Sequence, residues 1–174
     1  VLTSWMHAAE RFDFRLNVAT PPELKPQQWL LDNQIYHGKF GYEVIQPFKV
    51  ASGDTLLVSR GWVAGSLDRA RLPAVPTPGG QVAIKGYLYR PGDAYLLQEE
   101  SAGSGWPRVV QAANVEKMYK ALGETGKIAR PFLLRLDDSD MHLLAAHWQI
   151  INVQPEKHTA YAMQWFGMAL LLLI

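Results

Sequence analysis

The last twenty residues of the chain constrain its architecture more than any other stretch. Residues 155–174 begin with Pro155 and carry their two formal charges, Glu156 and Lys157, in what would be the first helical turn. Proline and an acidic residue suit that turn, and a helix that then becomes apolar all round belongs in lipid or in a large core. From Thr159 the run is roughly 16 residues, or about 24 Å, shorter than the ~30 Å hydrocarbon core of a bilayer. We interpret this segment as the start of a transmembrane helix that the sequence truncates.

The alternative is a buried C-terminal helix of a soluble domain, which short apolar runs often form. Residues 170–174 are five large aliphatic residues in succession, so they would cover every face of a helix. Tyr161, Trp165 and Phe166 lie just ahead of them and are typical of the aromatic belt at a membrane interface. The pattern therefore favours a membrane helix, with the buried helix kept as the alternative.

The rest of the chain has the alternation of β-strands. Residues 11–18 alternate polar and apolar side chains without a break, which predicts a half-buried strand. Further expected strands occupy residues 28–33, 42–50, 55–63, 81–90, 95–97, 107–112, 132–136 and 147–153. Pro47 predicts that its strand lies at an edge or carries a bulge, and residues 65–80 are expected to form a long exposed loop.

One helix is marked at both ends, by Asn114 as N-cap and Gly123 as C-terminal stop. The fold class expected is mainly β (α+β), an antiparallel barrel- or sandwich-like domain with one soluble helix. Residues 11–154 would form this extramembrane β domain. Residues 1–10 have near-helical apolar spacing, and because Val1 is not an initiator we expect a first transmembrane helix to be missing before them.

Composition excludes several functions. A net charge of +1 with interleaved signs offers no basic patch for nucleic acid. The absence of cysteine excludes disulfides, thiolate catalysis and cysteine-ligated zinc. The sequence contains no nucleophile elbow, no Walker loop and no helical pair of zinc-binding histidines, so we expect no enzyme.

His158 is the histidine whose position suggests a role. It lies in the first turn of the expected membrane helix, with Tyr161 and Trp165 on the same stripe at i+3 and i+7. An imidazole there can be an axial haem ligand, with the flat aromatic neighbours bounding the macrocycle. The alternative is an interfacial histidine that faces lipid headgroups.

Five motifs in register resemble the surfeit locus protein 1 family over residues 30–166. They are Leu30-Leu31-Asp32-Asn33, Gly41-Tyr42-Glu43-Val44-Ile45-Gln46-Pro47-Phe48, Leu57-Val58-Ser59-Arg60-Gly61-Trp62-Val63, Gly105-Trp106-Pro107-Arg108, and Lys157-His158 followed by Tyr161-Ala162 and Gln164-Trp165-Phe166. Three positions depart from the family pattern, since Ser59 stands where Asn is usual, Gln34 where Arg is frequent and Ala64 where Pro is frequent.

The resemblance implies an assembly factor for haem-copper cytochrome c oxidase, held in the bacterial cytoplasmic (inner) membrane with its β domain on the periplasmic side. Its partners would be the catalytic subunit of the oxidase and other assembly factors. The cofactor implied is haem a, and His158 is the position that matches the family's iron ligand.

Other residues complete the expected haem a site. Tyr161 and Trp165 would line the ring, and Gln164 would hydrogen-bond a polar substituent. Arg60 and Arg108 are candidates for pairing with the propionates, because a guanidinium matches a carboxylate in a fork geometry. The alternative function is a cofactor-free, membrane-anchored scaffold that stabilises an oxidase assembly intermediate through protein contacts, with the loop at residues 65–80 docking a partner.

Overall fold

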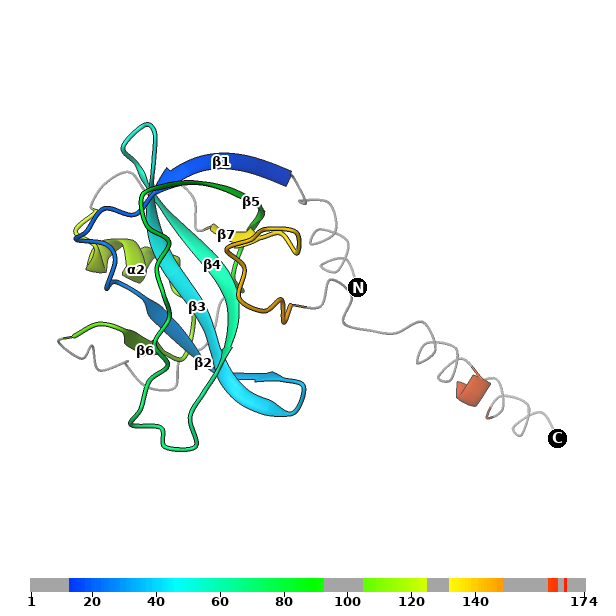
Figure 1. Cartoon of the computed structure of the whole chain (residues 1–174). Helices are drawn as coiled ribbons and strands as arrows, with labels where there is room; N and C mark the ends of the chain where they lie inside the picture. Colours follow the sequence, from blue (N-terminus) through cyan, green and yellow to red (C-terminus); the bar gives the residue numbers. More distant parts are fainter. Residues whose placement is uncertain (1–12, 93–104, 125–131, 149–162, 166–167, 169–174) are drawn as a thin grey trace.

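The computed structural model describes residues 13–92, 105–124, 132–148, 163–165 and 168 (Figure 1). Seven strands in these residues belong to one sheet, and one helix packs against it. The elements are β1 (Asp13–Ala19), β2 (Trp29–Tyr36), β3 (Lys39–Val50), β4 (Thr55–Ala64), β5 (Gln81–Tyr89), β6 (Arg108–Val110), α2 (Val115–Ala121) and β7 (Leu133–Leu136).

The sheet closes on itself. Its strand order is β1-β5-β7-β4-β3-β2-β6, and β1 also pairs with β3 where Val18 meets Val50. The five strands β1, β5, β7, β4 and β3 therefore form a closed barrel, and β2 and β6 extend the sheet beyond it. Pairing is antiparallel except between β2 and β6 and between β4 and β7. The mainly β prediction is confirmed, with the barrel rather than the sandwich.

Strand β3 changes partner along its length. It pairs with β2 as far as Ile45, whereas its pairing with β1 begins at Lys49. Pro47 lies between these two registers, where the backbone N–H that proline lacks is not needed for a ladder. Of the two expectations for Pro47, the edge strand is wrong because β3 is paired on both sides, and an irregularity is present nearby, between Glu43 and Ile45.

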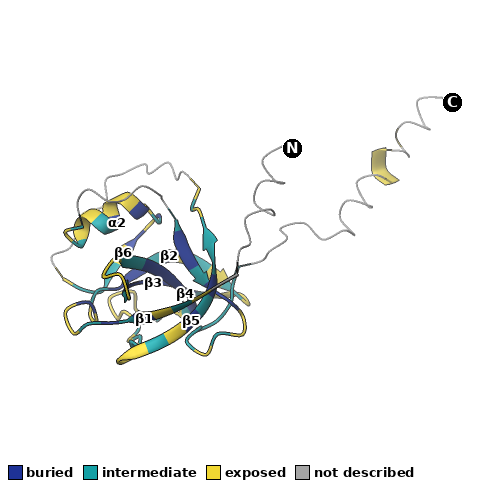
Figure 2. Cartoon of the chain, turned by 90° about the horizontal axis from the view of Figure 1, so that it is seen from above, coloured by how far each residue is buried: buried dark blue, intermediate teal, exposed yellow. Residues whose placement is uncertain are grey.

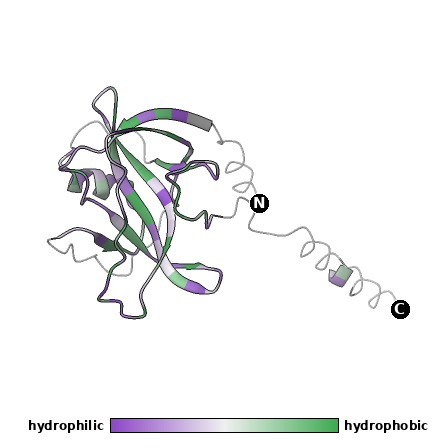
Figure 3. Ribbon diagram, in the orientation of Figure 1, coloured by the Kyte–Doolittle hydropathy of each residue, from purple (hydrophilic) through white to green (hydrophobic). Residues whose placement is uncertain are grey.

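Both faces of the central strands are covered, so apolar residues point to both sides (Figure 2). The barrel interior is filled by Val18, Phe48, Val58, Ile84, Leu134 and Leu136. The opposite face packs under α2 and contains Trp29, Ile45, Leu57, Val110, Val115, Met118 and Leu133. Strand β1 keeps the alternating pattern of a strand with one covered face, as its colours in Figure 3 show.

The loop between β4 and β5 is only partly the exposed loop that the sequence predicts. Leu67 is fully exposed, but Val75 packs against the apolar cluster of Leu30, Tyr42 and Val44. The hydroxyl of Thr77 accepts hydrogen bonds from the side-chain amides of Gln28 at 3.1 Å and Gln46 at 2.6 Å. The second half of the loop is therefore bonded to the barrel, whereas Leu67 in the first half is exposed.

Several expectations about the two ends of the chain lie outside the described residues. These concern residues 1–10, the expected strand at residues 95–97 and most of residues 155–174. His147 and Trp148, the start of the last expected strand, have no strand pairing, and residues 149–153 are outside the description. Within the described part of the chain, no helix has the length and apolar character required to cross a bilayer. The transmembrane helix and the domain boundaries stay predictions.

Candidate functional site

A cleft with a volume of about 600 Å³ lies between β6 and α2. This is within the range of about 300 to 1,000 Å³ that small-molecule sites occupy. Its described lining includes Trp29, Trp106, Arg108, Val110, Lys117 and Met118. The rings of Trp29 and Trp106 meet edge to face, with centroids 4.9 Å apart and an interplanar angle of 89°. The cleft therefore combines aromatic walls with two cationic side chains.

Arg108 opens β6 and lines this cleft. Its amide donates to the carbonyl of Gln28 at 2.9 Å, and it pairs in parallel register with Trp29. Its guanidinium lies 4.3 Å from the ring centroid of Trp106, a stacking geometry that suits arginine. The Nε atom of Arg108 is buried and has no hydrogen-bond partner. Since a buried donor without an acceptor is costly, an acceptor bound here would be stabilised.

Helix α2 forms the opposite wall and is capped at both ends as the sequence predicts. The side-chain oxygen of Asn114 accepts a hydrogen bond from the amide of Lys117 at 2.9 Å. Gly123 follows the helix with φ +76°, the left-handed conformation that favours glycine at a C-terminal stop. Val115 and Met118 are the buried residues of the helix and fix it to the sheet. Lys117 therefore stands at a defined position beside the cleft.

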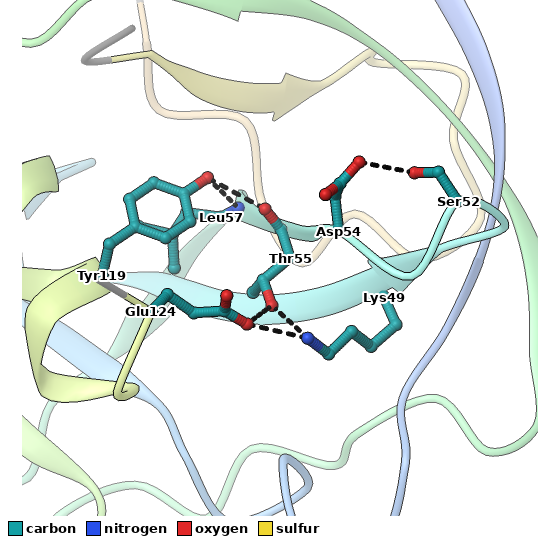
Figure 4. Close-up of polar contacts among 7 residues, drawn as sticks. All are labelled: Lys49, Ser52, Asp54, Thr55, Leu57, Tyr119 and Glu124. Carbon is teal, nitrogen blue, oxygen red and sulfur yellow. Dashed lines mark hydrogen bonds and ion pairs between the residues drawn. The ribbon is translucent and has the colours of Figure 1, made fainter. Parts of the chain in front are cut away.

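A group of polar contacts holds the C-terminal end of α2 against the hairpin of β3 and β4 (Figure 4). The hydroxyl of Tyr119 donates to the carbonyl of Thr55 at 3.2 Å and accepts from the amide of Leu57 at 3.4 Å. Glu124 pairs with Lys49 at 2.8 Å and accepts from the hydroxyl of Thr55 at 2.5 Å. Burial raises the pKa of Tyr119, so its hydroxyl stays a donor at neutral pH. These contacts set the position of the helical wall of the cleft.

Arg60 lies in the interior of the barrel and is 4% exposed. Its guanidinium donates to the side-chain oxygen of Gln46 at 3.1 Å and to the carbonyls of Pro76 at 2.7 Å and His142 at 3.2 Å. Burial lowers the pKa of Arg60, and the charge of Asp140 opposes that shift. A propionate would have to displace protein acceptors to reach this guanidinium. The structure does not bring Arg60 and Arg108 together, since Arg60 is not part of the cleft lining.

A second buried polar group surrounds Glu43, which is 3% exposed. The hydroxyl of Ser59 donates to its carboxylate at 2.5 Å, and Arg135 approaches the same oxygen to 3.7 Å. The Nε2 atom of His147 lies 3.6 Å from the other carboxylate oxygen and 3.2 Å from the side-chain oxygen of Gln34. We call these five residues the Glu43 cluster. Two of its members, Ser59 and Gln34, are positions where the sequence departs from the family pattern.

His147 is held neutral inside the Glu43 cluster. Burial lowers its pKa, the carboxylate of Glu43 raises it, and Arg135 lowers it. Because both neighbours of Nε2 are oxygen acceptors, the neutral ring carries its proton on that nitrogen. Among the described residues, no three His, Asp or Glu side chains gather as a metal site. Sequence analysis missed this cluster, although an acidic residue at Glu43 between the apolar residues Tyr42 and Val44 of an expected strand was a signal of it.

The expected iron ligand His158 and the residues expected to surround the haem ring belong to the C-terminal segment. His158 and Tyr161 lie outside the described residues. Gln164 and Trp165 are helical and exposed, Trp165 by 68%. Exposed side chains of this kind are free to contact a bound group or a partner. The described candidates for the haem a site thus lie in three places: Gln164 and Trp165 near the C-terminus, Arg108 in the cleft and Arg60 inside the barrel.

The fold and the site define a small closed β-barrel domain with an aromatic and cationic cleft beside helix α2. The chain belongs to the SURF1 family, whose sequence model matches residues 5–170. The match confirms the family resemblance drawn from the five motifs. SURF1 proteins are assembly factors linked to cytochrome oxidase.

Short stretches of the chain are also similar to enzymes. The ornithine carbamoyltransferase of Bradyrhizobium diazoefficiens is 69% identical over 32 residues, which are 18% of this chain and 10% of the enzyme. That of Brucella ovis is 39% identical over 72 residues, 41% of this chain and 23% of the enzyme. The chain thus spans between a tenth and a quarter of the length of these relatives. Similarity over so short a part does not carry the activity of the whole enzyme to this chain.

Proposed function

We propose that this protein binds haem a and assists its insertion into the catalytic subunit of cytochrome oxidase. The observation that carries the proposal is the family match over residues 5–170, which includes the segment around His158 as well as the barrel. In this proposal the protein is anchored in the bacterial inner membrane with the barrel on the periplasmic side. Its partners are the catalytic subunit and other assembly factors.

The chain offers residues of suitable chemistry for this cofactor. The imidazole of His158 is of the type that ligates haem iron axially. On a helix, Tyr161 and Trp165 share the stripe of His158 and would bound the ring, and Gln164 would donate to a polar substituent. The exposure of Gln164 and Trp165 supports this role. Of the two arginines, Arg108 has the free donor that a propionate needs, whereas Arg60 is bonded within the barrel.

The test is an optical spectrum of the full-length protein co-expressed with the haem a pathway. We expect the wild type to show a haem absorption band and His158→Ala to lose it. The matched control is His142→Ala, which removes a half-buried barrel histidine but leaves the backbone carbonyl that binds Arg60. An unchanged band with normal stoichiometry in His158→Ala would refute the ligand role.

A cofactor-free scaffold is the second candidate, in which the loop between β4 and β5, with its fully exposed Leu67, contacts a partner protein. Capture of the oxidase catalytic subunit by the full-length protein separates the two functions. Equal capture from cells that make haem a and from cells that cannot would support the scaffold. Capture that requires haem a supports the cofactor carrier.

A further inference from the structure

We propose that the cleft between β6 and α2 binds the carboxylate of an apolar, aromatic small molecule, and that Arg108 recognises this carboxylate. The inference rests on the proposed function in one respect, because the physiological molecule would then be haem a, whose ring edge bears two propionate carboxylates. The residues of the cleft favour a carboxylate ligand whether or not that ligand is haem a.

The charge of the cleft is of one sign. Its described lining contains two cationic side chains, Arg108 and Lys117, and no aspartate or glutamate. The chain as a whole is nearly neutral, with a net charge of +1, so the pairing of two cations in one concave site is a local feature. A cleft with apolar walls concentrates the field of such charges. The site therefore favours an anionic group.

The geometry of Arg108 indicates what kind of anion fits. The guanidinium carbon of Arg108 lies 4.3 Å from the ring centroid of Trp106, and a guanidinium held over a ring can still donate through its N–H groups. Its Nε is buried without an acceptor. A carboxylate matches the Nε side of a guanidinium through two parallel hydrogen bonds. Arg60 shows the contrast, since it donates to a glutamine side chain and to two backbone carbonyls.

The remaining walls indicate the body of the ligand. Trp29 and Trp106 present ring faces and edges at right angles, and the buried thioether of Met118 is a soft contact for an aromatic ring. A volume of about 600 Å³ accommodates a small molecule or the edge of a macrocycle. An apolar ring that carries a carboxylate satisfies both the walls and the cations.

The experiment measures binding of metal-free protoporphyrin IX to the full-length protein in detergent, by porphyrin absorbance and fluorescence. This probe has two carboxylates but no iron, so His158 cannot ligate it. We expect saturable binding that Arg108→Gln weakens at least about tenfold, the effect of losing a charge-assisted hydrogen bond. Lys117→Gln should weaken it less, because Lys117 keeps only a point charge beside the cleft.

Arg69→Gln is the matched control, because Arg69 also stacks on an aromatic ring, 4.5 Å from the centroid of Phe40, but lies outside the cleft lining. It should bind porphyrin as the wild type does. The dimethyl ester of protoporphyrin IX tests the carboxylate with the unaltered protein, and it should bind as weakly as the acid binds to Arg108→Gln. If Arg108→Gln does not fold, Arg108→Lys replaces it. This variant keeps the charge but loses the paired N–H donors of the guanidinium, so it should also bind the acid more weakly than the wild type.

Equal binding of acid and ester, or no binding of the acid, overturns the proposal. The fluorescent fatty acid cis-parinaric acid tests a lipid ligand. If it binds with the same dependence on Arg108 while porphyrin does not bind, the cleft recognises the carboxylate of a lipid, and the aromatic ligand is rejected. If His158→Ala abolishes the haem a band while Arg108→Gln binds porphyrin as the wild type does, the proposed function is supported and the carboxylate site in the cleft is rejected. The reverse pair of results keeps the cleft and rejects the iron ligand.

Discussion

Gly61 is the residue at which the chain after β7 returns to the barrel. Its φ is +98°, and a Cβ at this position would lie 2.5 Å from the carbonyl oxygen of Ala145. That carbonyl accepts a hydrogen bond from the amide of Trp62 at 2.7 Å, and the amide of Leu144 donates to the backbone carbonyl of Arg60 at 2.8 Å. The segment is thus bonded along β4, and the backbone contact leaves no room for a side chain at Gly61.

We predict that Gly61→Ala lowers the free energy of unfolding by about 2 to 4 kcal/mol, through backbone strain together with overpacking. The matched control is Gly53→Ala, where φ is +86° but nothing lies within 4 Å of the added Cβ. It should cost only the strain, about 1 to 2 kcal/mol. Urea denaturation of both variants measures the difference, and equal costs would contradict the close approach at Gly61.

His147 makes stability depend on pH. Burial lowers its pKa below the ordinary value of 6.5, so the folded protein keeps the ring neutral while the unfolded chain takes up a proton. Its contribution is fully present above about pH 6.5 and is lost as the pH falls toward the lowered pKa of the folded state. We predict that the free energy of unfolding decreases through this window and that His147→Gln flattens the decrease.

Urea denaturation at a series of pH values tests this dependence. His142→Gln is the matched control and should keep the wild-type slope, because it leaves the Glu43 cluster intact. A His147→Gln variant with the same slope as the wild type would show that the ring is not held neutral by its surroundings.

At the level of elements, α2 depends on its N-cap. We predict that Asn114→Ala lowers the free energy of unfolding by about 1 kcal/mol, because it leaves the amide of Lys117 without its acceptor. Asn114→Asp keeps an acceptor and should stay close to the wild type. Chemical denaturation followed by circular dichroism measures both variants. Equal stability of the alanine and aspartate variants would mean that packing of Val115 and Met118 alone holds the helix.

The elements that sequence analysis predicted well are those defined by local signals. The cap at Asn114, the stop at Gly123 and the alternating strands depend on neighbours in the sequence, and the structure confirms them. For Pro47 the sequence left open an edge strand or a bulge, and it could not choose between them because the choice depends on where β3 exchanges β2 for β1. The contacts of the loop at residues 65–80 could not be predicted from sequence, because Thr77 is bonded to Gln46, 31 positions away.

At the level of the whole molecule, the choice of a barrel over a sandwich could not be made from sequence. It depends on the pairing of Val18 with Val50, a contact between strands that are distant in the chain. The Glu43 cluster likewise joins strands β2, β3, β4 and β7 to the segment at His147. For the candidate site, sequence analysis predicted Arg108 and the C-terminal residues. It did not predict Trp29 or Lys117, which the fold brings beside Arg108.

The measurement that tests the function most directly is the amount of assembled cytochrome oxidase in membranes of bacteria that lack their own member of the family. Reduced-minus-oxidised haem a absorbance reports this amount after the full-length protein is supplied. We predict that the wild type restores the absorbance and that His158→Ala, present at the same level, does not. Restoration by His158→Ala would contradict the role in haem a transfer, and failure of the wild type would contradict the role in oxidase assembly.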